Sequence, residues 1–354
     1  MKANSKRSIR GLSLIELMIA LLIGSILMIG VVQVFAASRT AYQLSEGMSR
    51  VQENGRFALD YLQRDIRMAG HFGCVNDQAR GQINGALNSH FAANGPMDFG
   101  FSVRGYENAS PPGITLSPTR VAGTDSIVLR FMTGNGVPVT SIDIAGSSVD
   151  VDPSKWSVLT DGGVAAPAIF GLSDCAFADV FIADSTNPGA GRVVAPNTVD
   201  LGRYGVASDE GGPTMLYRGE AVVYYIGLGA GGQPSLWRAR INADGSSNSE
   251  ELVEGIENMQ FRYGMDRNAV GTLPSGYIAS QGTATDVGTT EAAWRRVGQV
   301  QVALLAASPD RAASAQASAV TPTLLGVTPA LPADGRYRTV YQGTIALRNR
   351  LYGN

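Results

Sequence analysis

The feature that most constrains this chain is a long apolar run near its start. Residues 17–38 are 22 consecutive residues without a charged side chain, enough to cross a lipid bilayer as an α-helix. Glu16 lies directly before this run, where a carboxylate costs roughly 2.5–3.5 kcal/mol on insertion scales, so it is expected to have a function and a partner. Four cations between residues 2 and 10 predict a cytoplasmic N-terminus, with the rest of the chain across the membrane.

This start resembles the type IV prepilin signal, in which a basic leader ends in glycine and is followed by an apolar helix with an early glutamate. Here the glycine is Gly11 and the helix opens with residues 12–16. The resemblance implies that a prepilin peptidase cleaves between Gly11 and Leu12, that Leu12 is N-methylated, and that Glu16 is the fifth mature residue. Prepilins usually carry phenylalanine at the first mature position, and a bulky leucine should still suit both reactions.

Cleavage would free an α-amine on Leu12, which offers a carboxylate an opposite charge. Pairing between Glu16 and the amine of a neighbouring subunit would favour one stagger between packed helices. Two alternatives remain open. Glu16 can stay hydrated at the interface while the segment acts only as an anchor. The segment can also be a secretory signal peptide cut after Ala36, although such apolar regions are about 7–15 residues long and uncharged.

Length and composition fit an exported chain with a large folded part. The 354 residues leave room for one large or two small domains after the N-terminal helix. Net charge is −2 and only 16% of residues are charged, so no electrostatic footprint for nucleic acid is present and none is expected as a partner. The 43 glycines and 16 prolines point to turns between short strands. The folded head should therefore be rich in β-structure.

The two cysteines, Cys74 and Cys175, favour a disulfide over a metal site or a catalytic thiol, because an even pair is typical of exported chains. The bond would close a loop of about 100 residues, worth roughly 4–5 kcal/mol in the chain-entropy model. The alternative is a pair of buried free thiols.

Residues 39–69 continue the first helix with an amphipathic pattern. If the helix is unbroken from residue 12 to residue 69, it is about 87 Å long. One small domain cannot cover such a helix, so its first half must lie in lipid or against other subunits. Gly70 and Gly73 are candidate stops. The apolar face recurs at three- and four-residue steps: Leu44, Met48, Val51, Gly55, Ala58, Leu62, Ile66 and Ala69.

Beyond the helix, alternating or short apolar runs predict antiparallel strands. Residues 75–120 give no clear element, and residues 271–290 and 307–321 are expected to be long loops. The predicted strands are 126–132, 137–144, 178–182, 214–228, 235–241, 256–263, 300–304 and 337–347.

No pattern in the sequence favours catalysis or a bound cofactor or metal. The glycines of residues 227–232 match a dinucleotide-binding spacing, but Gln233-Pro234 leads into a second strand instead of the helix that a phosphate site requires, which predicts a hairpin. The acidic positions in residues 150–152 and 266–268 have too few carboxylates for a calcium loop and are expected to be solvated loops. The usual nucleophile, base and zinc motifs are missing, although a hydrolase with paired carboxylates far apart in sequence stays open.

A narrower resemblance is to the PilW family of type IV pilus minor pilins. It covers residues 8–75 and most of residues 200–352, whereas the middle of the chain resembles no family. The segments that carry it are 53–59, 64–70, Gly73-Cys74, 201–207, 252–264, 300–305 and 347–351. The first region is shared by all type IV pilins and pseudopilins, and the second gives the finer assignment.

The resemblance implies an α+β, type IV pilin-like fold: a long N-terminal helix on a large antiparallel β-sheet head. Its expected parts are a leader (1–11), a membrane and assembly half-helix (12–38), an amphipathic half-helix (39–70) and a periplasmic head (71–354).

The implied function is a minor pilin that helps to initiate pilus assembly, at or near the tip. Implied partners are prepilin peptidase, other minor pilins, the major pilin, the inner-membrane assembly machinery and the lipid bilayer. The chain would sit in the inner membrane and then reach the pilus surface. The alternatives are a type II secretion pseudopilin and a membrane-tethered periplasmic adhesin or enzyme.

Overall fold

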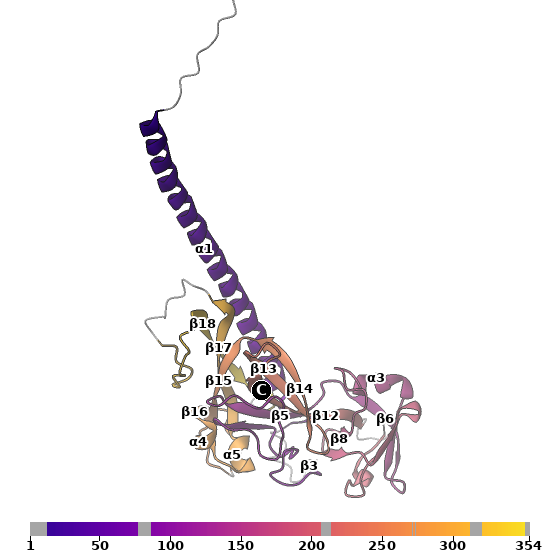
Figure 1. The fold of residues 1–354 in the computed structure, drawn as a ribbon. Coiled ribbons are helices and arrows are strands. Elements are labelled where there is room, and N and C mark those ends of the chain that lie inside the picture. Colours follow the sequence, from indigo (N-terminus) through magenta and orange to yellow (C-terminus); the bar gives the residue numbers. More distant parts are fainter. Residues whose placement is uncertain are drawn as a thin grey trace, which may run out of the picture.

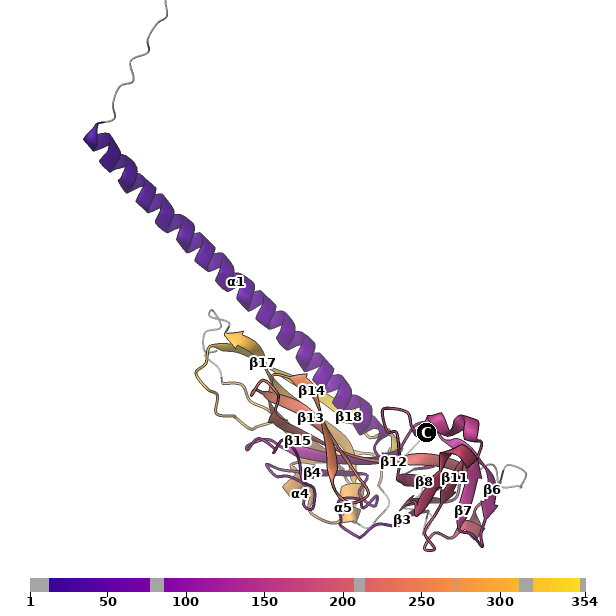
Figure 2. The same ribbon diagram turned by 45° about the vertical axis from the view of Figure 1, so that its right-hand side comes forward.

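The computed structural model describes residues 13–76, 86–206, 214–270, 272, 274–311 and 321–350. A single helix, α1 (Leu14–Met68), projects from a β-rich head (Figures 1 and 2). Its 55 residues span about 82 Å at 1.5 Å per residue. The head is mostly antiparallel, so the α+β, pilin-like architecture expected from the sequence is confirmed.

Helix α1 ends where the sequence predicts. Ala69 is its C-cap, and Gly70 and Gly73 have φ values of 77° and 73°, which only glycine adopts without strain. The chain then forms a two-stranded hairpin of β1 (His71–Phe72) and β2 (Val75–Asn76). The turn of this hairpin holds Cys74 at the exit of the helix.

The second half of α1 packs on a four-stranded sheet with the order β16-β15-β17-β18. Gly55 lies directly against the ring of Tyr341, where an added Cβ would come within 2.3 Å of ring carbons. The predicted helix face is confirmed. Its positions from Val51 to Ala69 are buried, and its two N-terminal positions, Leu44 and Met48, are half-buried. The strands are β15 (Ile256–Asp266), β16 (Ile278–Gly282), β17 (Val297–Arg311) and β18 (Arg336–Ala346).

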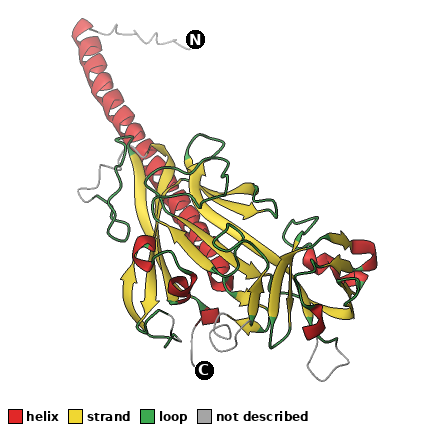
Figure 3. Cartoon of the chain, turned by 90° about the horizontal axis from the view of Figure 1, so that it is seen from below, coloured by secondary structure: helices red, strands yellow, loops and turns green. Residues whose placement is uncertain are grey.

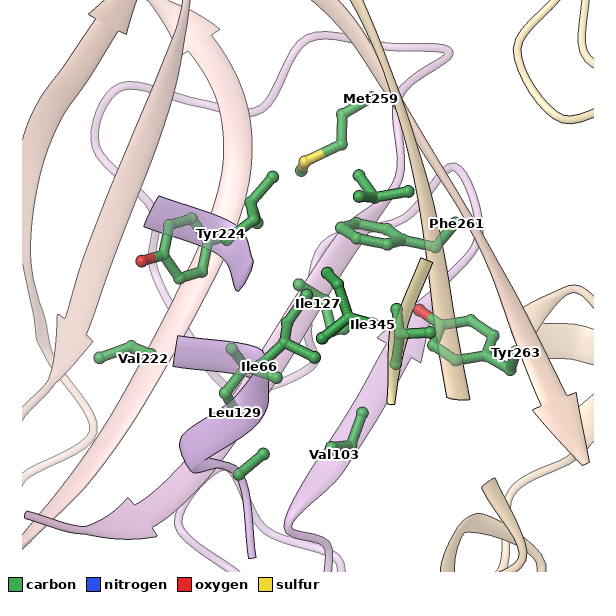
Figure 4. Packing of buried hydrophobic residues seen from close by; sticks show 14 of the residues in the cluster. Ile66, Val103, Ile127, Leu129, Val222, Tyr224, Met259, Phe261, Tyr263 and Ile345 are labelled. Atoms are coloured by element: carbon green, nitrogen blue, oxygen red, sulfur yellow. The ribbon is translucent and has the colours of Figure 1, made fainter. Parts of the chain in front are cut away.

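Strand β12 (Met215–Leu228) organises the second sheet. Its residues 222–228 pair with β13 (Pro234–Ile241), and residues 219–224 pair on the other side with β5 (Ser126–Met132). Strands β14 (Ser247–Glu254) and β4 (Val103–Tyr106) extend the sheet from β13 and β5. The main core lies where α1 and the two sheets meet (Figure 4), among Ile66, Val103, Ile127, Leu129, Val222, Tyr224, Met259, Phe261, Tyr263 and Ile345.

The other end of β12 enters a second body, residues 133–206, which we call the distal lobe. It lies at the end of the head away from the start of α1 (Figures 1 and 3). Residues 215–218 of β12 pair with β8 (Ile169–Ser173), and residues 215–216 pair with β6 (Val137–Asp143). The lobe has its own core, which includes Val149, Trp156, Phe170 and Phe181, and to which β12 contributes Leu216. Its elements are β6 (Val137–Asp143), β7 (Ser148–Val151), η1 (Pro153–Lys155), α3 (Trp156–Leu159), β8 (Ile169–Ser173), β9 (Ala178–Ile182), β10 (Ser185–Asn187), η2 (Pro188–Ala190), β11 (Arg192–Val194) and η3 (Leu201–Arg203).

The eight predicted strands are all present, and the predicted loops are wrong in part. Residues 271–290 contain β16 and the short helix α4 (Ala284–Val287), and the short helix α5 (Glu291–Arg295) follows directly. Thr283 and Thr290 are the N-caps of these two helices. Residues 307–311 belong to β17, whereas residues 312–320 lie outside the described residues. The stretch 75–120 holds β3 (Leu87–Ser89) and β4, and η4 (Arg348–Arg350) follows β18.

Candidate assembly interface

The first half of α1 has no contact with the head. Its large apolar side chains are all more than half exposed, with Leu14 at 76% and Phe35 at 69%. Within the described residues, α1 is the one helix long and apolar enough to cross a membrane, and none of its most apolar stretch is buried. Since the exposure of so much apolar surface to water is unfavourable, lipid or other subunits must cover it.

The start of α1 is closed by a reciprocal cap between Ser13 and Glu16. The backbone N–H of Glu16 donates to Ser13 Oγ at 3.2 Å, and the backbone N–H of Ser13 donates to Glu16 Oε2 at 3.3 Å. A carboxylate in the first turn also faces the positive end of the helix dipole. Glu16 is therefore partly satisfied by its own helix. The predicted processing residues Gly11 and Leu12 lie outside the described residues.

The second half of α1 is fixed to the head by a buried polar contact that the sequence reasoning missed. Asp65 Oδ2 accepts a hydrogen bond from the hydroxyl of Tyr224 at 2.6 Å. The same oxygen forms an ion pair with Arg238 at 3.2 Å. Burial, and then the charge of Asp65, raise the pKa of Tyr224 well above its usual value, so its hydroxyl stays a donor. Arg238 also pairs with Glu250. The contact joins the helix to β12 and β13.

The predicted disulfide is present in the structure. Cys74, in the β1–β2 turn, bonds to Cys175, in the turn between β8 and β9, with their Cα atoms 4.8 Å apart. The bond therefore ties the end of α1 to the distal lobe across a sequence separation of 101 residues. Together with the Asp65 contact, it attaches the end of the helix to the head at two places, which we call the joint.

The glycines of residues 227–232 form a hairpin turn, as predicted. The N–H of Gly229 donates to the carbonyl of Gln233 at 2.7 Å, and β12 continues directly into β13. The turn opens no helix, so it cannot present a helix N-terminus to a phosphate.

The expectation of solvated acidic loops is wrong for two positions. Asp150 lies in β7 and pairs with Arg192, and Asp266 is 2% exposed at the end of β15, where it accepts hydrogen bonds from Asn268 and Ser275. Asp152 caps η1. Each of these carboxylates serves a local structural contact. Among the described residues, no group of three or more His, Cys, Asp or Glu side chains is placed to hold a metal ion.

A long helix, apolar and exposed in one half and packed on an antiparallel head in the other, defines the class of type IV pilin-like proteins. The comparisons with known families agree. Residues 6–32 match the prokaryotic N-terminal methylation motif, and residues 223–349 match PilW, the type IV pilus-assembly protein W. The chain thus carries both sequence signatures of a PilW-family minor pilin, which confirms the resemblance. No curated protein and no solved structure matches it.

These matches define a pilus-related pilin that is processed by prepilin peptidase, in a family of structural proteins. The exposed apolar half of α1 fits a single-pass anchor in the inner membrane. Residues 33–222 lie between the two matched regions, and the whole distal lobe falls within them.

Proposed function

We propose that this chain is a minor pilin that helps to initiate type IV pilus assembly together with other minor pilins, at or near the pilus tip. The observation that carries the proposal is the division of α1: its second half is fixed to the head, and its first half presents an uncovered apolar surface. A subunit built this way can wait in the membrane and then exchange lipid contacts for contacts with neighbouring helices. The proposed parts are the leader (1–11), the membrane half-helix (12–38), the amphipathic half-helix (39–70) and the periplasmic head (71–354).

Glu16 is the proposed register residue. After cleavage between Gly11 and Leu12, its carboxylate would pair with the N-methylated amine of Leu12 on a neighbouring subunit. The cap to Ser13 supports this role, because it fixes the carboxylate at the end of the helix before any neighbour arrives. An opposite charge in a low-dielectric setting then selects one stagger over the others.

Two substitutions at Glu16 separate its charge from its cap. Glutamine keeps the cap, since it also serves at this position of a capping box, but it cannot form an ion pair. We expect Glu16→Ala and Glu16→Gln both to abolish the contribution of this subunit to piliation, with the chain still processed. Piliation restored by Glu16→Gln would show that only the cap matters and would remove the register role.

The width of the head supports the proposed tip position. The distal lobe extends the head beyond the sheets that carry α1 (Figure 2), and such bulk would strain a tightly packed shaft. Immunogold labelling of purified pili should therefore place this chain at pilus ends. Labels spread evenly along the shaft would contradict the tip position.

The alternatives make different predictions. A type II secretion pseudopilin would be encoded among secretion-system genes, and the match of residues 223–349 to the PilW family favours the pilus. A tethered adhesin or enzyme would keep its activity when Glu16 is replaced, since the pilin-like start would only localise it.

A further inference from the structure

An open polar cleft lies at the end of the head opposite the start of α1. It forms between α5 and the segment of residues 86–100, which begins with β3, and its volume is about 410 Å³. Both α5 and β3 lie on this side of the head in Figures 1 and 2. The volume is within the range of small-molecule sites, about 300–1,000 Å³. On a pilin anchored by its N-terminal helix, this surface faces away from the membrane.

The polar groups that line the cleft are held in place by the fold. Asp98 accepts the backbone N–H of Asn94 at 2.8 Å and that of Gly100 at 2.9 Å, one on each carboxylate oxygen. Ser89 Oγ accepts the backbone N–H of Phe99 at 3.1 Å. Within the described part of the chain, the hydroxyl hydrogen of Ser89 remains available to donate, and each oxygen of Asp98 keeps a second acceptor position. A ligand would therefore meet groups that are already oriented.

The remaining polar groups extend this mixture of donors and acceptors. The side-chain amide of Asn88 donates through Nδ2 to Asp179 at 3.2 Å. Its carbonyl oxygen can act as a hydrogen-bond acceptor. On α5, Glu291 and Arg295 form an i,i+4 ion pair at 3.0 Å, and both side chains are 34% exposed. An arginine has five N–H donors, so this single pair does not exhaust it.

An aromatic ring completes the lining. Phe91 is partly exposed and stacks on buried Phe99, with the ring centroids 5.5 Å apart and an interplanar angle of 28°. The contact fixes the orientation of the ring at the edge of the cleft. A fixed ring face can pack against the C–H groups on one face of a ligand.

The charges and the polarity select the class of ligand. Among the described lining residues, Glu291 and Arg295 pair with each other, so Asp98 leaves the cleft with a net negative charge, which disfavours an anion. The polar lining disfavours an apolar molecule. A neutral ligand rich in hydroxyl groups fits best, since each hydroxyl donates one hydrogen bond and accepts others. We propose that this cleft binds a neutral saccharide, with Asp98, Glu291 and Arg295 bonding hydroxyl groups and Phe91 packing against the sugar ring.

The test uses the full processed chain purified in detergent, on an array of neutral oligosaccharides and acidic ones that carry sialic or uronic acids. Titration calorimetry with the best neutral glycan then compares two charge-neutral double variants. Glu291→Ala/Arg295→Ala removes the ion pair in the cleft. Glu46→Ala/Arg50→Ala removes an exposed i,i+4 pair on α1, far from the cleft, and is the matched control. Exposed pairs contribute little to stability, so the control variant should fold. The cleft pair is only 34% exposed, so a second variant covers the case in which its removal unfolds the chain.

We expect binding of neutral glycans, at least about tenfold weaker in the cleft variant and unchanged in the control, where tenfold corresponds to 1.4 kcal/mol. If the cleft variant does not fold, Phe91→Leu must weaken binding to a similar extent, since it keeps apolar volume but loses the ring. The proposal fails if no neutral glycan binds, if only acidic glycans bind, or if both double variants bind as the unmodified chain does. These results are independent of piliation, so they leave the assembly role untouched.

Discussion

Replacing Asp65 by alanine tests how the helix is attached to the head. Asp65 is 8% exposed on the inner face of α1, and its Oδ2 holds both the hydroxyl of Tyr224 and the guanidinium of Arg238. Alanine removes both contacts at once. The hydroxyl of Tyr224 is then left buried without this partner, whereas Arg238 keeps its pair with Glu250.

The expected loss follows from these two contacts. The hydroxyl of Tyr224 keeps a contact of 3.5 Å with the carbonyl of Tyr61, which is too long to replace the bond to Asp65. A buried hydroxyl that is largely unsatisfied costs about 1–3 kcal/mol. The side chain of Arg238 is 23% exposed and still paired, so its lost contact adds only about 0–1 kcal/mol. Alanine is the better helix former, which returns up to about 0.7 kcal/mol. The net destabilisation is about 2 kcal/mol, and the melting temperature should fall by about 4–8 °C for a head of this size.

Thermal unfolding of the full chain in detergent measures this loss. Asp60→Ala is the matched control, because Asp60 is exposed on the same helix and its replacement gains helix propensity without losing the contact. In the Tyr224→Phe background, Asp65→Ala should cost about 1 kcal/mol or less, since no hydroxyl is then left unpaired. Equal melting temperatures for Asp65→Ala and Asp60→Ala would refute the reasoning.

Three further predictions concern the joint and the sheet. Replacing both disulfide cysteines by serine should lower the free energy of unfolding by roughly 4–5 kcal/mol in the chain-entropy model, measured by denaturant titration; an unchanged midpoint would contradict it. Gly55→Ala should destabilise by about 1–3 kcal/mol in thermal unfolding because its Cβ meets the ring of Tyr341, whereas Gly30→Ala, with nothing within 4 Å, should not. The hydrogen bond from Arg338 lowers the pKa of Asp334 to about 2. The stability difference between the unmodified chain and Asp334→Asn should therefore be full above about pH 4, decline below it and be lost as pH falls through 2; a constant difference would contradict this.

The sequence predicted the parts of the fold that follow from local patterns. The helix face from Val51 to Ala69 has a clear 3.6-residue period, and the two glycines after it adopt the left-handed conformations that end a helix. The alternation in residues 256–263 and 337–347 likewise predicted β15 and β18. The cysteine pair was predictable from its compartment, and the position of Cys175 in a turn was not.

The rest depends on contacts between distant residues. Asp65 lies three residues after Leu62, on the buried face of the helix, and this position was the available sign that its carboxylate is buried. Its partners could not be predicted, because they lie more than 150 positions further on. The sequence of β12 predicts one strand, which has 14 residues. No local pattern showed that one end pairs with strands of the main sheet and the other with strands of the distal lobe. The cleft between residues 86–100 and α5 joins short elements with weak periodicity. Asp266 was predicted to be solvated because the contacts that bury it come from Arg296 and Ser275, which are not adjacent to it in the sequence.

The mass of the mature N-terminus tests the central claim most directly. The protein would be purified from membranes and from sheared pili, and its N-terminal peptide identified by mass spectrometry. Processing as a pilin predicts a chain that begins at N-methylated Leu12 and keeps Glu16 as its fifth residue in both fractions. A chain that begins after Ala36 would contradict the account, because the exposed apolar half of α1 would then be a discarded signal peptide.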